Sequence, residues 1–199
     1  MSLSNLFAER ITQTLEKHGY INHEQYVFYY YTYDWITEQA IYYSSLVFLG
    51  ILIHLPLPAF IYCLISCSLR CSAGGMHASS KMLCSIISYT EFIIIMYLIS
   101  LNILPAIYKL NMVLIYAVSL VIIIVLAPLD HPNKRLSNVK KTKHKVYCIK
   151  VCFISCGFLM FFHFTGLTKC QQTITICTII SAADLMIGTL LNRRYHNAD

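Results

Sequence analysis

The sequence predicts an all-α protein: a polytopic transmembrane helical bundle with four clear spans and a proline-broken N-terminal hairpin, hence up to six membrane segments, preceded by an amphipathic helix. Of its 199 residues, 57% are hydrophobic and only 12% are charged, whereas soluble domains carry about 25% charged residues. The mean hydropathy is +0.61. Several apolar runs approach the length of about 20 residues with which a helix crosses a bilayer. We therefore expect one integral membrane domain over residues 1–199.

Residues 1–40 form a polar N-terminal region. Apolar side chains recur at helical spacing along its first part, which predicts an amphipathic helix that lies on the membrane or packs on the bundle: Leu3, Leu6, Phe7, Ile11 and Leu15. Residues 20–40 are rich in tyrosine and suit a membrane interface. The region begins polar and acidic, so we expect no cleavable secretory signal.

Residues 41–69 form the first strongly apolar stretch, interrupted by Leu-Pro-Leu-Pro at 55–58. The stretch is long for one span and short for two, and two prolines so close together break or bend a helix. We expect a hairpin of two short helices. Whether it crosses the bilayer twice or is re-entrant stays open.

Four clearer spans follow over residues 82–104, 110–126, 146–167 and 173–191, within a helical region of 82–191. Lysine and arginine mark the cytoplasmic side of membrane proteins. The loop 70–81, the basic loop 128–145 and the tail 192–199 together hold ten of these residues, and the opposite connectors hold only Lys109 and Lys169. We therefore expect those two loops and the tail to face the cytoplasm.

The net charge of +6 arises mainly from residues 134–150. A nucleic-acid-binding protein would place such a patch on a folded polar domain, and the sequence offers none, so we expect no nucleic-acid partner. Nine cysteines are present, mostly inside apolar runs, where a thiol packs as a small side chain. A metal site at Cys63, Cys67, Cys71 and His77 is the less favoured alternative, because typical zinc sites place ligand pairs on turns. We expect no metal and no cofactor.

The segment 70–84 carries the residues suited to chemistry. The Gly74–Gly75 pair gives the backbone unusual freedom, His77 follows, and Cys84 stands near the start of an apolar span. Ser79 or Ser80 is a plausible N-cap for that span. A thiol near a helix N-terminus and beside an imidazole is an activated nucleophile.

His77 and Cys84 cannot meet on one straight helix, because residues seven apart are separated by about 10 Å along the axis. The pairing requires a loop that returns His77 over the helix start. From spacing alone, packing of both side chains remains an alternative.

Two sequence blocks resemble the AgrB family, the quorum-sensing propeptide processors of Gram-positive bacteria. The first is Arg70-x3-Gly74-Gly75-x-His77-Ala78-x5-Cys84, and the second is Ala127-Pro128-x-Asp130-x2-Asn133-Lys134-x-Leu136. Chain length and the order of spans also agree. Arg135 departs from the pattern, since members often have proline there, so the second block is supportive only.

The resemblance implies a bacterial cell-membrane cysteine endopeptidase whose catalytic loop, 70–84, faces the cytoplasm. Cys84 would cleave the C-terminal tail from an AgrD-like propeptide through a thioester, His77 would serve as general base and acid, and an internal thiol or hydroxyl of the precursor would close a thiolactone or lactone. The resemblance also implies a homodimer. Gly74 and Gly75 would shape the oxyanion or positioning loop.

Each of the other polar residues allows a functional and a structural interpretation. Arg70 could position a substrate carboxylate or carbonyl, or snorkel at a span end. Glu91 and Asp184 are intramembrane carboxylates, which are costly and often functional, but they could also hold helices together. Basic side chains of the 128–145 loop could dock an acidic substrate tail or serve only as a topology signal: Lys134, Arg135, Lys140 and Lys141.

Two other classes of function compete with the enzyme. Spans carrying Glu91 and Asp184 could line the path of a peptide transporter or exporter. A non-catalytic membrane scaffold that binds an amphipathic peptide is the third.

Overall fold

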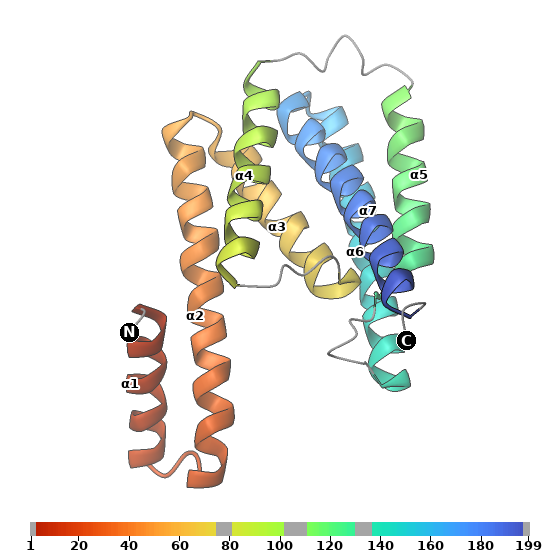
Figure 1. The fold of residues 1–199 in the computed structure, drawn as a ribbon. Helices are drawn as coiled ribbons and strands as arrows, with labels where there is room; N and C mark the ends of the chain where they lie inside the picture. The colour runs from red at the N-terminus through yellow and green to blue at the C-terminus, as the bar shows by residue number, and fades with distance from the viewer. Residues whose placement is uncertain (1–2, 75–80, 102–110, 130–136, 197–199) are drawn as a thin grey trace. The chain divides into compact units, whose positions relative to one another are not determined.

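The computed structural model describes residues 3–74, 81–101, 111–129 and 137–196. These residues form seven α-helices, with no strand in any of the described ranges (Figure 1). The predicted all-α fold is confirmed. The chain comprises two compact units, residues 1–49 and 50–199. The single membrane domain expected over the whole chain stays a prediction.

The first unit holds α1 (Leu3–Lys17) and most of α2 (His23–Leu52). On α1 the buried side chains are small or polar and recur every four residues: Ser4, Ala8 and Thr12. Leu6, Phe7 and Ile11 of the predicted apolar face are exposed. Because α1 buries its small residues and exposes its bulky apolar ones, its apolar face is available to contact lipid.

The break in the proline-rich stretch lies at residues 53–55. Helix α2 ends at Leu52, and α3 (Pro56–Ala73) begins on Pro56, where the missing N–H costs nothing. A Cβ added to Gly50 would lie 2.2 Å from the Ala59 Cβ, so only glycine permits this approach of the last turn of α2 to the first turns of α3.

Helix α2 differs from the expected hairpin arm in its start. It begins at His23, so the apolar stretch from residue 41 is the second half of a 30-residue helix. The physical reason is that residues 23–49 contain neither proline nor glycine, and nothing ends the helix earlier.

The second unit contains α3, α4 (Lys81–Ser100), α5 (Asn111–Leu126), α6 (Asn138–Phe164) and α7 (Thr168–His196). Helix α7 contacts each of the other four, and it runs between α4 and α5 in Figure 1. Tyr62 of α3 and Phe92 of α4 meet edge to face, with ring centroids 5.1 Å apart. The core of this unit therefore lies around α7 and α3.

Four described helices are long and apolar enough to cross a membrane: Pro56–Ala73, Met82–Ser100, Asn138–Phe164 and Thr168–Leu191. Three of them correspond to predicted spans. The fourth belongs to the proline-broken stretch, where the sequence predicted only short helices. The predicted span 110–126 corresponds to the shorter apolar helix Val113–Leu126 within α5, and residues 102–110 lie outside the described part.

Candidate functional site

Cys84 is the fourth residue of α4, so its side chain belongs to the first turns of that helix. The thiol is partly buried and forms no disulfide. Cys84 therefore lies at the end of α4 whose backbone N–H groups have no carbonyl partner within the helix. The local structure therefore suits a nucleophile.

His77, Gly75 and the expected N-cap residues Ser79 and Ser80 lie outside the described residues. The predicted pairing of His77 with Cys84 stays a prediction. Lys134 and Arg135 of the second block lie outside them as well.

Arg70, near the C-terminal end of α3, joins that helix to the face of α4 that carries Cys84. Its guanidinium donates a hydrogen bond to Ser88 Oγ at 2.7 Å and forms an ion pair with the Glu91 carboxylate. The Arg70 side chain is 35% exposed and that of Glu91 is 15% exposed. Because Cys84, Ser88 and Glu91 are spaced by four and three residues, they share one side of α4.

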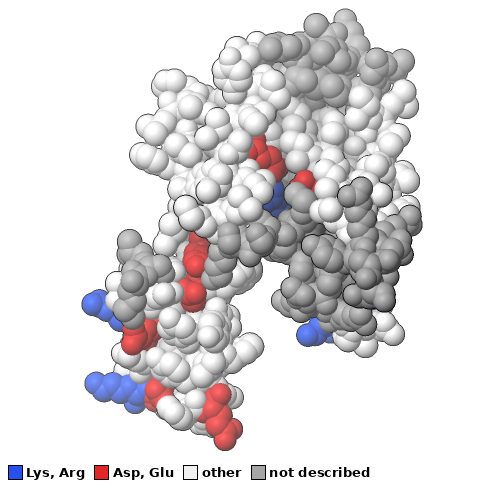
Figure 2. Space-filling model, viewed as in Figure 1, with Lys and Arg blue, Asp and Glu red and all other residues white. Residues whose placement is uncertain are grey.

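A second carboxylate from α7 completes this arrangement. Asp184 interacts electrostatically with both Arg70 and Glu91. We call Arg70, Ser88, Glu91 and Asp184 the Arg70 cluster. Figure 2 shows acidic side chains next to a basic one in the upper half of the drawn face. The cluster ties α3, α4 and α7 together one to two turns from Cys84.

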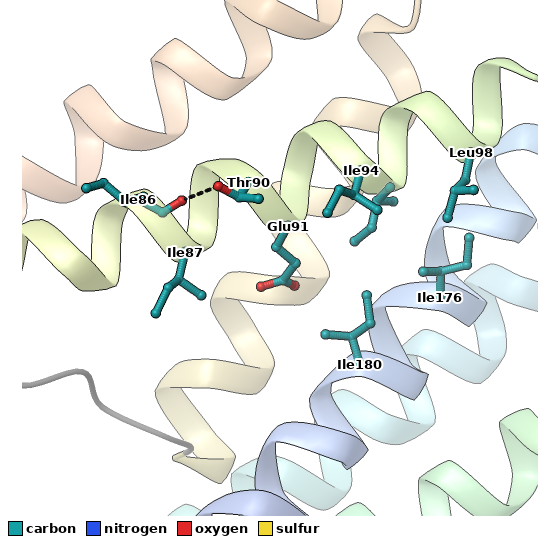
Figure 3. A pocket seen from close by; sticks show the side chains of 9 residues that line it. Ile86, Ile87, Thr90, Glu91, Ile94, Leu98, Ile176 and Ile180 are labelled. Carbon is teal, nitrogen blue, oxygen red and sulfur yellow. Dashed lines mark hydrogen bonds between the residues drawn. The ribbon is translucent and has the colours of Figure 1, made fainter.

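A groove of about 400 Å³ lies beside the Arg70 cluster, between α4 and α7. Isoleucine and leucine side chains of both helices line it, together with Thr90 and Glu91 (Figure 3). The Thr90 hydroxyl is tied to the backbone carbonyl of Ile86 at 2.8 Å, as the dashed line in Figure 3 shows. Among the described residues, Glu91 is thus the only charged side chain that lines this groove.

Gly74 ends α3 and brings the two sequence blocks into contact. Its backbone has φ +75° and ψ −158°, a conformation that essentially only glycine adopts. A Cβ at Gly74 would lie 3.1 Å from the Leu129 carbonyl oxygen. The Leu129 N–H donates to the Ala73 carbonyl at 2.9 Å. The end of α3, which precedes the segment that leads to Cys84, is therefore bound to the segment that follows α5.

Lys145 of α6 stabilises the same junction. Its ammonium donates to the carbonyls of Ala127 at 2.8 Å and Ile124 at the C-terminal end of α5. These carbonyls have no partner within the helix, and a cation there also complements the helix dipole. Lys140 is exposed and Lys141 is partly buried near the start of α6.

The cysteines of α3 and those of α6 recur every four residues, so each set lies along one side of its helix. Within them, Cys63, Cys148 and Cys152 are buried, while Cys71 is exposed. Cys148 contacts Ser72 of α3, in keeping with thiols that pack between helices. Among the described residues no group of three His, Cys, Asp or Glu side chains is placed to hold a metal ion.

The family model of AgrB, Accessory gene regulator B, matches residues 8–189. The chain belongs to the AgrB family. It is 28% identical over 149 residues to Putative AgrB-like protein 2 of Clostridium perfringens (strain 13 / Type A), a match covering 71% of this chain and 66% of that protein. The chain thus spans slightly less than two thirds of that curated relative. No solved structure matches the chain.

Membership in the AgrB family supports a role as a quorum-sensing accessory gene regulator. Together with the four long apolar helices, it indicates a multi-pass membrane protein. The resemblance drawn from the two sequence blocks is confirmed at the level of the family.

The sequence did not predict the contacts of three residues near the candidate site: Ser88, Leu129 and Lys145. Ser88, the hydrogen-bond partner of Arg70, could have been found, because it falls between Cys84 and Glu91 at helical spacing. Leu129 and Lys145 could not, since the contacts they make with α3 and α5 join positions far apart in the sequence.

Proposed function

We propose that this protein is a membrane cysteine endopeptidase that matures an AgrD-like peptide precursor. Cys84 attacks the peptide bond before the C-terminal tail, and the tail leaves as an amine. The remaining peptide stays on Cys84 as a thioester. An internal thiol or hydroxyl of the precursor then displaces Cys84 and closes a thiolactone or lactone ring.

The observation that carries the proposal is the position of Cys84 in the first turns of α4, partly buried and in line with the Arg70 cluster. Membership in the AgrB family and the Arg70–Cys84 sequence block support it further. A cysteine nucleophile reacts as its thiolate, and in this proposal His77 is the base that forms it.

His77 moves the protons in this scheme. It accepts the Cys84 thiol proton and delivers it to the nitrogen of the departing tail, as a general base and then a general acid. In the second half it takes the proton of the precursor's own thiol or hydroxyl, and the thiol of Cys84 is regenerated. No outside oxidant or reductant is needed.

Cyclisation competes with hydrolysis of the thioester. Exchange of one thioester for another changes the bond energy little, whereas attack by water destroys the acyl enzyme. A site at the edge of the bilayer limits the access of water. The basic side chains at the start of α6, including Lys140 and Lys141, would attract an acidic leaving tail.

The test is to mix a candidate precursor with the protein in liposomes and to seek the covalent adduct by mass spectrometry. Wild type should accumulate a thioester of peptide mass on Cys84. Cys84→Ser should form no thioester, and His77→Ala should process the precursor about 10²- to 10⁴-fold more slowly. Cys71→Ser, which alters an exposed cysteine of α3, is the matched control. Equal processing by Cys84→Ala would eliminate the proposal.

A further inference from the structure

We propose that the groove between α4 and α7 binds the apolar part of the peptide that stays joined to Cys84, as about five residues of extended chain. The inference rests on the proposed function, because it assigns a binding site to the peptide that Cys84 attacks.

The groove continues from the nucleophile along one side of α4. Ile87, Glu91, Ile94 and Leu98 line it, and they follow Cys84 in steps of three and four residues, so all five positions share one face. The first of them lies about 4.5 Å from Cys84 along the helix axis. An acyl chain attached to the sulfur therefore meets the groove within one turn.

The dimensions of the groove set the length of its occupant. From Ile86 to Leu98 the lining residues of α4 span twelve steps, which is about 18 Å at the rise of an α-helix. An extended peptide advances about 3.4 Å per residue, so about five residues fit. The volume of about 400 Å³ falls within the usual range of about 300–1,000 Å³ for binding pockets.

Glu91 distinguishes a peptide from lipid as the occupant. A carboxylate inside a membrane is costly to maintain, and a lipid acyl chain offers it no hydrogen-bond donor. An extended peptide presents backbone N–H groups that need acceptors in apolar surroundings. A carboxylate accepts about four hydrogen bonds, so its contacts with Arg70 and Tyr62 leave capacity for such a chain. The groove therefore suits a peptide better than lipid.

The acyl side of the cleaved bond fits this groove better than the leaving tail does. The tail must depart into water, whereas the acyl part has to be kept from water until its own thiol or hydroxyl captures it. The isoleucine side chains that line the groove, among them Ile94 of α4 and Ile180 of α7, provide the apolar surroundings that keep water from the acyl part.

The test uses acetyl-(Leu)n benzyl thioesters, with n from 1 to 8, and the full-length protein in liposomes. Transfer of the acyl group to Cys84 releases benzyl mercaptan, which is measured along with the mass of the acylated chain. Ile94→Trp fills the groove. Ile93→Trp is the matched control, because Ile93 is 57% exposed and Ile94 53% exposed, and only Ile94 lines the groove.

We expect the acylation rate of wild type to rise with n up to about five and then level off. The rate for Ile94→Trp should fall about 10-fold below that of Ile93→Trp at n = 5, a loss of about 1.4 kcal/mol, and the two should agree at n = 1. Alkylation of Cys84 by iodoacetamide should be the same in both variants, because the small reagent does not use the groove.

Equal acylation of the two variants at every n would overturn the proposal and leave the groove to lipid. It would also be overturned if Ile94→Trp slowed iodoacetamide as much as the pentaleucine probe. Failure of the proposed function looks different: the length-dependent acylation of Cys84 would persist, but no natural precursor would be processed.

Discussion

At the scale of single residues, Arg70 is the side chain whose role the structure defines most fully. The sequence left open whether it meets substrate or only reaches the interface. Its contacts with Ser88 and Glu91 hold its side chain against the side of α4 that carries Cys84. A guanidinium held in this way joins the middle of α4 to the C-terminal end of α3, the two helices that flank the segment containing His77.

Removing the charge of Arg70 should destabilise the protein. Arg70→Gln leaves the mostly buried Glu91 without its cation, and we expect a loss of about 1–3 kcal/mol in the free energy of unfolding, less than for a fully buried pair because Arg70 is partly exposed. Denaturation in detergent micelles measures it.

The double variant Arg70→Gln/Glu91→Gln provides the check on that interpretation. It should be less destabilised than the sum of the single variants, because neither partner then leaves a charge behind. Strict additivity would mean that the ion pair contributes nothing, and the Arg70 cluster would lose its structural role.

At the scale of elements, the end of α3 is the junction on which the site depends. Gly74 permits both the turn out of α3 and the approach of Leu129, while Lys145 closes the end of α5 from the other side. The two sequence blocks thus meet at one place, where Gly74 contacts Leu129, 55 positions further along the chain.

Gly74→Ala should disturb this junction. The backbone conformation is costly for any residue with a Cβ, by about 1–3 kcal/mol, and the new methyl group would press on the Leu129 carbonyl. We expect a lower stability of that size, together with slower processing of the precursor. Thermal denaturation and a processing assay measure the two effects.

Gly157→Ala is the matched control for Gly74. No neighbouring atom lies within 4 Å of a Cβ added there, and alanine in a helix is favoured over glycine by about 1 kcal/mol. Its stability should therefore stay equal or rise. Loss of stability at Gly157 equal to that at Gly74 would show that the junction has no special demand for glycine.

At the scale of the whole molecule, the orientation in the membrane decides whether Cys84 can meet a precursor made in the cytoplasm. The asymmetry of lysine and arginine predicts that the segments 70–81 and 128–145 share the cytoplasmic side. Neither segment is wholly a loop, because α3 extends to Ala73 and α6 begins at Asn138. Lys140, exposed near the start of α6, and Lys169, near the start of α7, should then lie on opposite sides.

Labelling with a membrane-impermeant maleimide tests this orientation. Lys140→Cys should be modified only in inverted vesicles and Lys169→Cys only in intact cells, with mass spectrometry locating the label among the native cysteines. Modification of residue 140 from outside intact cells would reverse the topology and place the catalytic loop away from its precursor.

The sequence predicted the fold class and most of the spans because long apolar runs are a strong and local signal. It missed the early start of α2, because the aromatic and polar residues at 23–40 are compatible with a helix but show no pattern that predicts one. The sequence also placed Cys84, Arg70, Glu91 and Asp184 in the chain, but not in contact. Pairings such as Arg70 with Asp184 depend on how α3 packs against α7, which no local pattern encodes.

The most direct test of the account is to alkylate Cys84 and to follow peptide maturation. The Cys71→Ala variant, which lacks the competing exposed thiol of α3, is treated with iodoacetamide. Peptide mapping gives the modified fraction at Cys84. The account predicts that cleavage and cyclisation fall in proportion to that fraction and vanish when modification is complete. Undiminished maturation by a fully alkylated Cys84 would contradict it.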